Sequence, residues 1–480
     1  MSTTIKIDPV TRIEGHLALE VTVDTVDGVE QVIDAKSSGT LFRGFEIILQ
    51  GRDPLDAPRL TQRICGVCPV SHGMASDMAL EEALNVTPPA NGRIMRNLVL
   101  AANFLQSHIL HFYHLAALDY IDTTGVIDMA PWSPRYVTGD MVGGATAAAL
   151  VGNYVKALEM RRKAHQMGAI IGGKMPSSPI FVPGGATMQP TMQKIADFRT
   201  LLTELRAFID NVMLPDVTAV ANAFPEYATI GTGSGKLISY GVFDTDGSGT
   251  NLLSAGRYTG SALLPVDPAD ITEYVKYSKY TSACGGLNPG RGATETQAGK
   301  TGAYSWLKSP RYLDEVYEAG PLARMKVSGL YSGGISVIDR IAARAQETKV
   351  VADAMDDWLN DIVIGDSVYT YKATPTAASG IGMTEAPRGA LAHWVDIAGG
   401  VISRYQVVTP TNWNASPKDD MDQPGPIEQA LVGTPVADIT QPIELLRVVH
   451  SFDPCLACAV HMVRPGRKKP ETIAYTRPSL

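Results

Sequence analysis

The sequence predicts an α+β fold that is predominantly α: a central bundle of long helices, an N-terminal β-hairpin or small sheet, and smaller peripheral β elements. Three observations predict it: alternating apolar residues near the N-terminus, long segments with apolar residues three and four apart, and Pro- and Gly-bearing stretches between them. The 480 residues are 45% hydrophobic and 19% charged, which is typical of a globular protein with a deep core.

A β-hairpin is expected first along the chain. Apolar residues alternate with other residues over 17–23, and residues 29–33 are again β-favouring. Between them Asp27 and Gly28 supply turn chemistry.

Four long helices are expected next. Over residues 91–118 apolar side chains recur at spacings of three and four, with no Pro and no Gly after Gly92, which is typical of a buried helix. Comparable patterns cover three more segments: residues 146–169, 192–214 and 338–359. Residues 231–250 are rich in Gly, Ser and Thr and predict a loop or short hairpins.

Charge and hydropathy exclude several classes of protein. The 41 basic and 49 acidic residues give a net charge of −8, the wrong sign for a broad nucleic-acid-binding face. No apolar run reaches the roughly 18 residues of a membrane span, and the N-terminus lacks the pattern of a signal peptide. We therefore expect no nucleic-acid partner, no membrane span and no export of the chain unaided.

Four of the five cysteines form two Cys-x-x-Cys pairs at opposite ends of the sequence: Cys65 with Cys68, and Cys455 with Cys458. Two pairs supply four soft thiolates, which suit zinc, an iron-sulfur cluster, or nickel and iron. On the cysteines alone, a structural zinc site that joins the chain ends remains an alternative. The fifth, Cys284, has no partner in sequence and is expected to be a small buried hydrophobe.

The residues around the pairs favour catalysis over a structural metal. Ionisable and conformationally special residues crowd both pairs, whereas a structural zinc site is chemically quiet. Glu14 and Glu46 lie near apolar segments, where a carboxylate can carry protons or bind a hard metal ion. Either glutamate can instead belong to a buried ion pair.

Five motifs follow one another along the chain: RIEGH at 12–16, RxCGxC at 63–68 followed by His72, EAPRG at 385–389, TNW at 411–413, and DPCxxCxxH at 453–461. In this order, and over essentially the whole chain, they resemble the large subunit of nickel-iron hydrogenases. QSHILHFYH at 106–114 looks most like the nickel-iron-selenium branch, although Cys455 stands at that branch's selenocysteine position.

The resemblance implies a nickel-iron centre held by the four cysteines. Cys65 and Cys455 match terminal ligands of nickel, Cys68 and Cys458 match bridges from nickel to iron, and the iron carries carbon monoxide and cyanide. Glu14 matches the family's proton gate, which takes a proton from the Cys455 sulfur.

The resemblance also implies the surroundings of this centre. Arg388 matches a guanidinium held over the metals, with an ordinary buried ion pair as the alternative. Four residues match neighbours of the centre: His72 by a bond to a bridging sulfur, Pro387 by lining the pocket, Thr411 by a hydroxyl donor to a diatomic ligand, and Asp453 by steadying Arg388. A separate magnesium or iron site is implied at Glu46, the carbonyl of Val407 and His461.

The implied activity is reversible oxidation of hydrogen to protons and electrons by a catalytic large subunit. An iron-sulfur small subunit is the implied obligate partner, because the chain has too few cysteines for its own cluster. A downstream carrier such as a cytochrome is also implied. We expect one catalytic domain over residues 1–461, and an extension over 462–480 that a maturation protease removes after His461.

The resemblance favours the periplasm or the periplasmic face of the membrane, reached with the small subunit; the alternative is the cytoplasm. Two other functions remain: a quinone-reducing respiratory subunit, whose relatives generally lack the four cysteines, and a zinc-binding interaction protein. Ser107 departs from the Asp of many standard nickel-iron enzymes. His108, His111 and His114 are expected to pack in the core rather than bind a metal.

Overall fold

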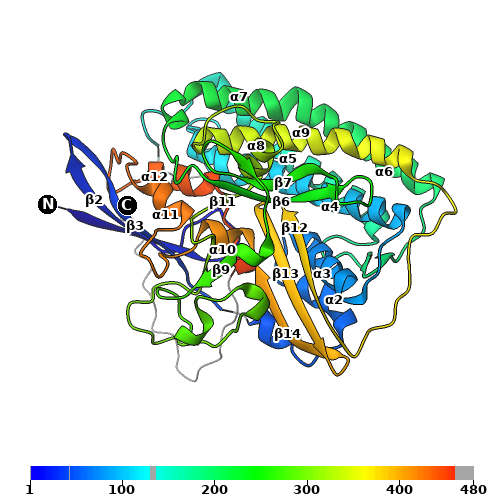
Figure 1. The fold of residues 1–480 in the computed structure, drawn as a ribbon. Helices are drawn as coiled ribbons and strands as arrows, with labels where there is room; N and C mark the ends of the chain where they lie inside the picture. The colour runs from blue at the N-terminus through cyan, green and yellow to red at the C-terminus, as the bar shows by residue number, and fades with distance from the viewer. Residues whose placement is uncertain (1, 43, 130–136, 460–480) are drawn as a thin grey trace.

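The computed structural model describes residues 2–42, 44–129 and 137–459, which fold into a mixed structure of helices and small sheets. The long helices lie along one side of the molecule and most strands lie on the other (Figure 1). The expectation of mixed helices and strands is confirmed. A central position of the helix bundle stays a prediction.

An antiparallel sheet at the N-terminal end has three strands: β1 (Thr3–Ile7), β2 (Leu17–Val26) and β3 (Val29–Gly39). The turn between β2 and β3 has φ of 51° at Asp27 and 84° at Gly28, as two-residue hairpin turns require. Alternate residues of β2 are buried from Leu17 to Val23. The expected hairpin is therefore confirmed, and β1 extends it.

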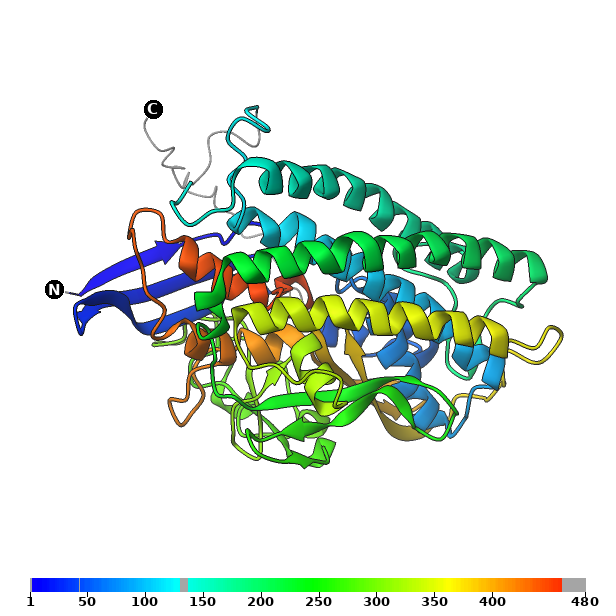
Figure 2. The ribbon, with the colours of Figure 1, turned by 90° about the horizontal axis from the view of Figure 1, so that it is seen from above.

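The four segments expected to be helical are helical: α4 (Ala90–Leu110), α5 (Gly144–Gly172), α6 (Met192–Phe208) and α9 (Val337–Asp361). Figure 2 shows them running side by side, with α4 against α5 and α9, and α6 against the same two helices. They pack through a shared cluster of buried apolar side chains, since each presents an apolar stripe to its neighbours.

Two of these helices end differently from the expectation. After α4 the chain continues as a π-helical turn over His111–Ala116. After α6 a second π-helical turn, Ile209–Met213, leads into α7 (Leu214–Ala223), past the expected end at residue 214. Pro215 lies where the π-helical turn joins α7, and because it has no N–H to donate, one helical hydrogen bond is absent there while the helical path continues.

The helix α3 (Pro69–Leu84) packs on a three-stranded sheet: β12 (Ala377–Ala386), β13 (Gly389–Ala398) and β14 (Val401–Val408). A Cβ atom at Gly380 would lie 2.0 Å from the Ala79 carbonyl oxygen, and one at Gly382 would lie 1.9 Å from the Ala75 carbonyl oxygen. The two glycines therefore let the strand touch the helix backbone. This packing fixes the turn between β12 and β13 relative to the start of α3.

Residues 231–250 contain β6 (Leu237–Asp244), which pairs with β7 (Asn251–Tyr258), so the expected hairpin is present. The remaining elements are short: α1 (Phe45–Leu49), α2 (Ala57–Thr61), β4 (Phe181–Val182), β5 (Gly185–Ala186), β8 (Leu263–Leu264), β9 (Ile271–Tyr274), β10 (Ser309–Tyr312), β11 (Glu318–Ala319), α8 (Pro321–Val327), α10 (Pro410–Asn414), α11 (Pro426–Leu431), α12 (Ile443–Ser451) and α13 (Leu456–Ala459). None of the described helices has the length and apolar character that crossing a membrane requires.

Candidate metal centre

Three cysteines from opposite ends of the sequence meet in the interior. Cys65 Sγ lies 3.4 Å from Cys455 Sγ, and both lie within 4.8 Å of Cys68 Sγ. Each residue is at most 2% exposed. Among the described residues, no other group of three or more His, Cys, Asp or Glu side chains is close enough to hold one metal ion. The donor set is soft and suits a transition metal such as nickel.

The turn before α3 brings the sulfur atoms of Cys65 and Cys68 close together. The backbone N–H groups of Val67 and Cys68 donate to Cys65 Sγ over 3.3 and 3.4 Å. Cys68 is the residue immediately before α3, and Pro69 begins the helix, a position where Pro is favourable. The spacing of the pair therefore becomes a compact turn with both sulfurs on one side.

Two amides of α4 hold this turn from behind. Asn103 Nδ2 and Gln106 Nε2 both donate to the Val67 carbonyl oxygen, over 2.9 and 3.0 Å. Arg161 Nε in turn donates to Gln106 Oε1 over 3.2 Å. These supporting residues were not predictable from the sequence, because amides within an apolar helical pattern carry no signal of what they face.

Cys455 lies between α12 and α13, and Thr411 holds its backbone. The Cys455 N–H donates to Thr411 Oγ1 over 2.9 Å. Thr411 lies in the first turn of α10, which Thr409 caps by accepting the N–H of Asn412. Thr411 is predicted to donate its hydroxyl hydrogen to a diatomic ligand. In the structure its oxygen accepts the Cys455 N–H, and its O–H can still donate.

The main chain of Glu14 pairs with the cysteine segment from the C-terminal end. Glu14 forms a parallel β-bridge with Cys455. Its N–H donates to the Pro454 carbonyl over 3.4 Å, and its carbonyl accepts the Leu456 N–H over 2.7 Å. Because these bonds use only main-chain atoms, the fold places the Glu14 residue beside Cys455 independently of its carboxylate.

Gly15 makes this close pairing possible. Its φ is +83°, and a Cβ atom there would lie 2.5 Å from the backbone nitrogen of Ala457. Gly28 has nearly the same φ, +84°, but a Cβ atom there would meet nothing within 4 Å. The two glycines therefore separate the effect of backbone strain from the effect of crowding.

Gly15→Ala should destabilise the protein by about 3 kcal/mol, because it combines strain with overpacking. Gly28→Ala should cost about 1 kcal/mol, from the left-handed conformation alone. Thermal unfolding of the two variants, together with their metal content, measures this difference. Equal losses of stability and unchanged metal content in both would show that the contact of Gly15 with Ala457 is not restrictive.

A partly buried ion pair anchors the loop that carries Glu14. Asp119 pairs with Arg12, and its Oδ2 lies 2.5 Å from His450 Nδ1. His450 Nε2 lies 2.9 Å from the Thr11 carbonyl oxygen, so the loop is tied to α12. Burial alone would raise the pKa of Asp119, but Arg12 and His450 lower it more strongly, to about 2.

Arg388 lies at the turn between β12 and β13 and reaches Asp453. Its Nε donates to the Asp453 carbonyl oxygen over 3.1 Å, and its Nη2 lies 3.0 Å from Asp453 Oδ1. Arg388 and Asp453 are 1% and 2% exposed. Burial lowers the pKa of Arg388, but Asp453 and then the sulfurs of Cys455, Cys68 and Cys65 outweigh it, so that this pKa lies well above its usual range.

The surroundings of Arg388 fit an anionic ligand on a metal held by the cysteines. Arg388 Nη1 is buried and has no hydrogen-bond acceptor in the part of the chain that the structure describes. A permanent cation with an unused donor, in electrostatic contact with three sulfurs, suits the nitrogen of a cyanide ligand. Pro387 precedes this arginine, and its carbonyl points instead to Arg324 Nη2, 2.9 Å away.

His72 begins a buried chain of hydrogen bonds. It lies in the first turns of α3, and its Nδ1 is 3.2 Å from His393 Nε2. His393 Nδ1 lies 2.9 Å from the Tyr405 hydroxyl oxygen, which lies 2.9 Å from Ser76 Oγ. Burial, and then the neighbouring His72, lower the pKa of His393 well below its usual value. His393 is therefore neutral and fixes the orientation of His72.

Glu46 and Val407 meet in a second buried polar cluster. Glu46 Oε1 accepts the Val407 N–H over 3.0 Å, and its Oε2 accepts the Thr294 hydroxyl. Burial raises the pKa of Glu46, although Lys308 acts in the opposite direction. Lys308 Nζ lies 3.0 Å from Glu273 Oε2. The Glu46 carboxylate is the kind of oxygen donor that a hard cation binds. Its neighbours Lys308 and Glu273 belong to no motif, so the sequence alone did not indicate them.

Several predicted residues lie outside the described part of the structure. They are the side chain of Cys458, whose backbone belongs to α13, and the whole of His461 and of the extension over 462–480.

The three histidines of the QSHILHFYH segment pack apart from one another, as expected. His108 Nε2 lies 2.8 Å from Glu347 Oε1, His111 Nε2 lies 2.6 Å from the His450 carbonyl oxygen, and His114 is 3.3 Å from the Tyr154 carbonyl oxygen. Burial lowers the pKa of His111 to about 3. Cys284 is fully buried in a small apolar cluster, as expected.

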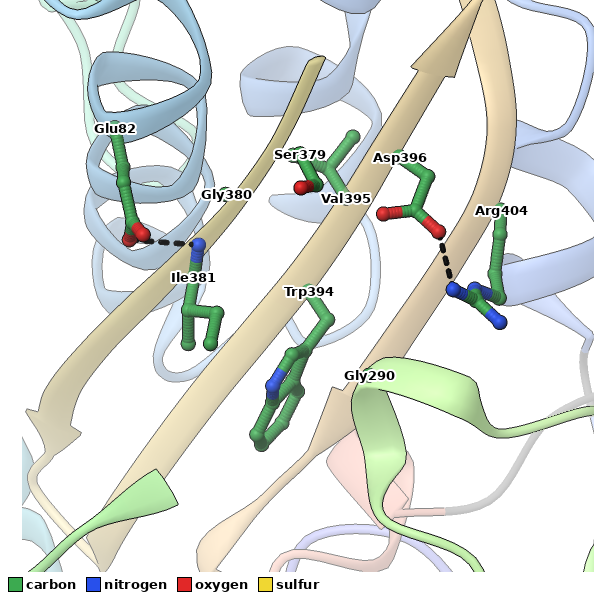
Figure 3. Close-up of a pocket in the computed structure, with 9 residues that line it drawn as sticks. All are labelled: Glu82, Gly290, Ser379, Gly380, Ile381, Trp394, Val395, Asp396 and Arg404. Carbon is green, nitrogen blue, oxygen red and sulfur yellow. Dashed lines mark hydrogen bonds and ion pairs between the residues drawn. The ribbon is translucent and has the colours of Figure 1, made fainter. Parts of the chain in front are cut away.

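A surface pocket of about 270 Å³ lies on the sheet of β12, β13 and β14 (Figure 3). In it the Glu82 carboxylate accepts the Ile381 N–H over 2.9 Å, and Asp396 pairs with Arg404. Its lining comprises Glu82, Gly290, Ser379, Gly380, Ile381, Trp394, Val395, Asp396 and Arg404. No cysteine lines it, so the pocket is separate from the metal centre.

Comparison with known families gives a match over most of the chain. The family described as "Nickel-dependent hydrogenase" matches residues 43–142, 128–332 and 331–461. A family described as "HoxL-like" matches residues 4–33.

Relatives and solved structures agree with this match. The chain is 43% identical to the periplasmic [NiFeSe] hydrogenase large subunit of Desulfomicrobium baculatum, covering 96% of this chain and 95% of the relative. It is 34% identical to the hydrogenase-2 large chain of Escherichia coli K12, covering 96% and 98%. The reduced Ni-Fe-Se hydrogenase of D. vulgaris Hildenborough superposes with a TM-score of 0.92 at 42% identity, covering 96% of this chain and 100% of that chain.

Proposed function

This chain belongs to the nickel-dependent hydrogenase family, close to its [NiFeSe] branch, and from that premise we propose that it is a catalytic large subunit that interconverts hydrogen with protons and electrons. The convergence of Cys65, Cys68 and Cys455 on one buried point beside Arg388 is the observation that carries the proposal. These residues come from three distant segments, so the fold brings together a donor set that the sequence keeps apart.

The cysteines are the proposed ligands. Cys65 and Cys455 would bind nickel terminally, and Cys68 and Cys458 would bridge it to an iron that carries carbon monoxide and cyanide. When bound, such a centre supplies the polarisation that lets hydrogen be cleaved into unequally charged parts. The 3.4 Å between Cys65 Sγ and Cys455 Sγ supports two of these sulfurs sharing one metal ion.

The neighbouring side chains orient the ligands and exclude water. Arg388 would donate its buried Nη1–H to a cyanide nitrogen, with Asp453 holding the guanidinium. Thr411 would donate its hydroxyl hydrogen to a diatomic ligand while its oxygen holds the Cys455 N–H. His72 would donate to a bridging sulfur, and Pro387 would line the space around the metal centre.

A proton released by hydrogen would first be held at Cys455 Sγ and then pass to the Glu14 carboxylate. The main-chain pairing of Glu14 with residues 454–456 supports this step, because it fixes the distance between the two residues. Glu14 is partly exposed, unlike Cys455, so it lies on the way from the buried sulfur towards the surface.

A divalent cation, magnesium or iron, is proposed at the second cluster. Glu46, the Val407 carbonyl and His461 would bind it, and the bond between the Val407 N–H and Glu46 supports their proximity. Since Glu46 is buried and its pKa is raised, a nearby cation would favour its ionised form.

We further propose that residues 1–461 form one catalytic domain on a central bundle of long helices, and that a maturation protease removes 462–480 after His461. Electrons would leave through an iron-sulfur small subunit towards a carrier such as a cytochrome. The chain would act in the periplasm or at the periplasmic face of the membrane, as the name of the D. baculatum relative supports; the alternative is the cytoplasm.

The test of the function is hydrogen-dependent reduction of a viologen dye by the protein purified together with its small subunit. The proposal expects hydrogen uptake coupled to reduction of the oxidised dye, and hydrogen production from protons when reduced dye is supplied. A complex that contains nickel and iron but performs neither reaction would contradict it.

A further inference from the structure

We propose that Arg324 is the positioning residue for Arg388: it holds the two residues before Arg388 by their carbonyl groups and so sets where that guanidinium meets the metal centre. The inference rests on the proposed function for what Arg388 does there. The placement of Arg388 by Arg324 stands on geometry alone.

All five N–H groups of the Arg324 guanidinium have acceptors. Nε and one N–H of Nη2 donate to the two carboxylate oxygens of Glu347, over 2.8 and 2.6 Å. One N–H of Nη1 donates to Glu385 Oε2 over 2.7 Å. The remaining two donate to the carbonyl oxygens of Ala386 and Pro387, each over 2.9 Å. A fork of five fixed donors is peculiar to Arg, and a Lys has only three.

The cluster formed by Arg324, Glu347 and Glu385 is fully buried, and other residues hold it in place. Arg324, Glu347 and Glu385 are each 0% exposed. His108 Nε2 contacts Glu347 Oε1 over 2.8 Å, and the Tyr240 N–H donates to Glu385 Oε1 over 2.7 Å. If one of these groups moved away, it would leave a buried charge without its partner, which is costly. The groups are therefore held in one arrangement.

The same part of the chain also touches the residue after Arg388. Gly389 has φ +135°, and a Cβ atom there would lie 2.8 Å from the Gly320 N atom. Gly320 directly precedes α8, the helix that carries Arg324. The backbone around Arg388 is therefore held on both sides, by Arg324 through Ala386 and Pro387 and by Gly320 through Gly389, and from there the side chain reaches Asp453.

Arg324→Lys is the test variant, and Arg311→Lys is its matched control. Arg311 is also 0% exposed, pairs with Asp419 over 2.6 Å, and has acceptors for all five N–H groups, none of them on residues 385–389. Both substitutions therefore remove two donors from a buried cluster, but only one affects residues 386 and 387. Glu347→Gln, which keeps the Arg324 guanidinium and loosens it, serves as a second variant.

Crystal structures and kinetics of the heterodimers decide the proposal. In Arg324→Lys the Arg388 guanidinium should leave Asp453, the cyanide stretching bands should shift, and kcat per nickel should fall about 10- to 100-fold with little change in KM for hydrogen. Arg311→Lys should lose similar thermal stability with none of these changes. Glu347→Gln should follow Arg324→Lys, with smaller effects, and replaces it if that variant does not fold.

An unmoved Arg388 in Arg324→Lys, or in Glu347→Gln, with bands and kcat equal to those of Arg311→Lys, would overturn the inference. Failure of the proposed function gives a different result. If the unsubstituted protein has no cyanide bands, the function is wrong, while the position of Arg388 in the crystal structures still decides whether Arg324 sets it.

Discussion

Replacing Cys455 by Ser should remove nickel from the protein and abolish hydrogen conversion. A serine oxygen is a hard donor that does not replace a thiolate on nickel. The fall in activity should exceed the roughly 10- to 100-fold that loss of a group merely supporting a metal ligand costs. Metal analysis and hydrogen uptake by the purified two-subunit protein measure both effects.

Cys284→Ser is the matched control for this change. Cys284 is as buried as Cys455, but it lies in a different apolar cluster, beside Tyr280 and Val275. The same substitution there should leave one nickel per chain and normal activity. Full nickel content in Cys455→Ser, or its loss in Cys284→Ser, would contradict the assignment of the ligands.

Glu14→Gln should leave the metal centre assembled and reduce turnover by at least about 100-fold, because proton transfer by a positioned carboxylate contributes that much or more. The amide has nearly the same size but cannot take up the proton from Cys455. Its main-chain bonds to Pro454 and Leu456 remain, since they do not involve the side chain. Nickel content, infrared bands and hydrogen oxidation are the measurements.

Glu20→Gln is the control for Glu14→Gln. Glu20 lies on the neighbouring strand β2 and pairs at the surface with Lys6 and Lys36. Its substitution should leave hydrogen oxidation unchanged, because surface pairs contribute little. Normal hydrogen oxidation in Glu14→Gln would remove Glu14 from the proton path.

Elements with strong periodicity were predictable from the sequence. The alternation in β2 and the apolar spacing of α4, α5, α6 and α9 depend on residues near one another in the chain. The π-helical turns His111–Ala116 and Ile209–Met213 were not predictable, because tertiary packing decides where a helix widens.

The site was predictable to the extent that its residues lie in motifs. The cysteines, Glu14 and Arg388 belong to short segments that resemble a known family. Arg324 and Glu347 belong to no such segment, and neither do the amides of α4 that hold Val67. Their partners are far away in sequence, so only the folded structure shows what they hold.

Backbone pairing is the clearest case of information that exists only in three dimensions. Nothing in the residues near Glu14 indicates that its main chain bonds to Pro454 and Leu456. Once the pairing is known, the glycine at position 15 is explained, because a side chain there would collide with Ala457.

Infrared spectroscopy combined with metal analysis, on the protein purified with its small subunit from cells that contain the maturation machinery, tests the central claim most directly. We expect one nickel and one iron at the cysteine site, with carbon monoxide and cyanide stretching bands that disappear in Cys458→Ser. One zinc per chain, with no nickel and no such bands, would contradict the account.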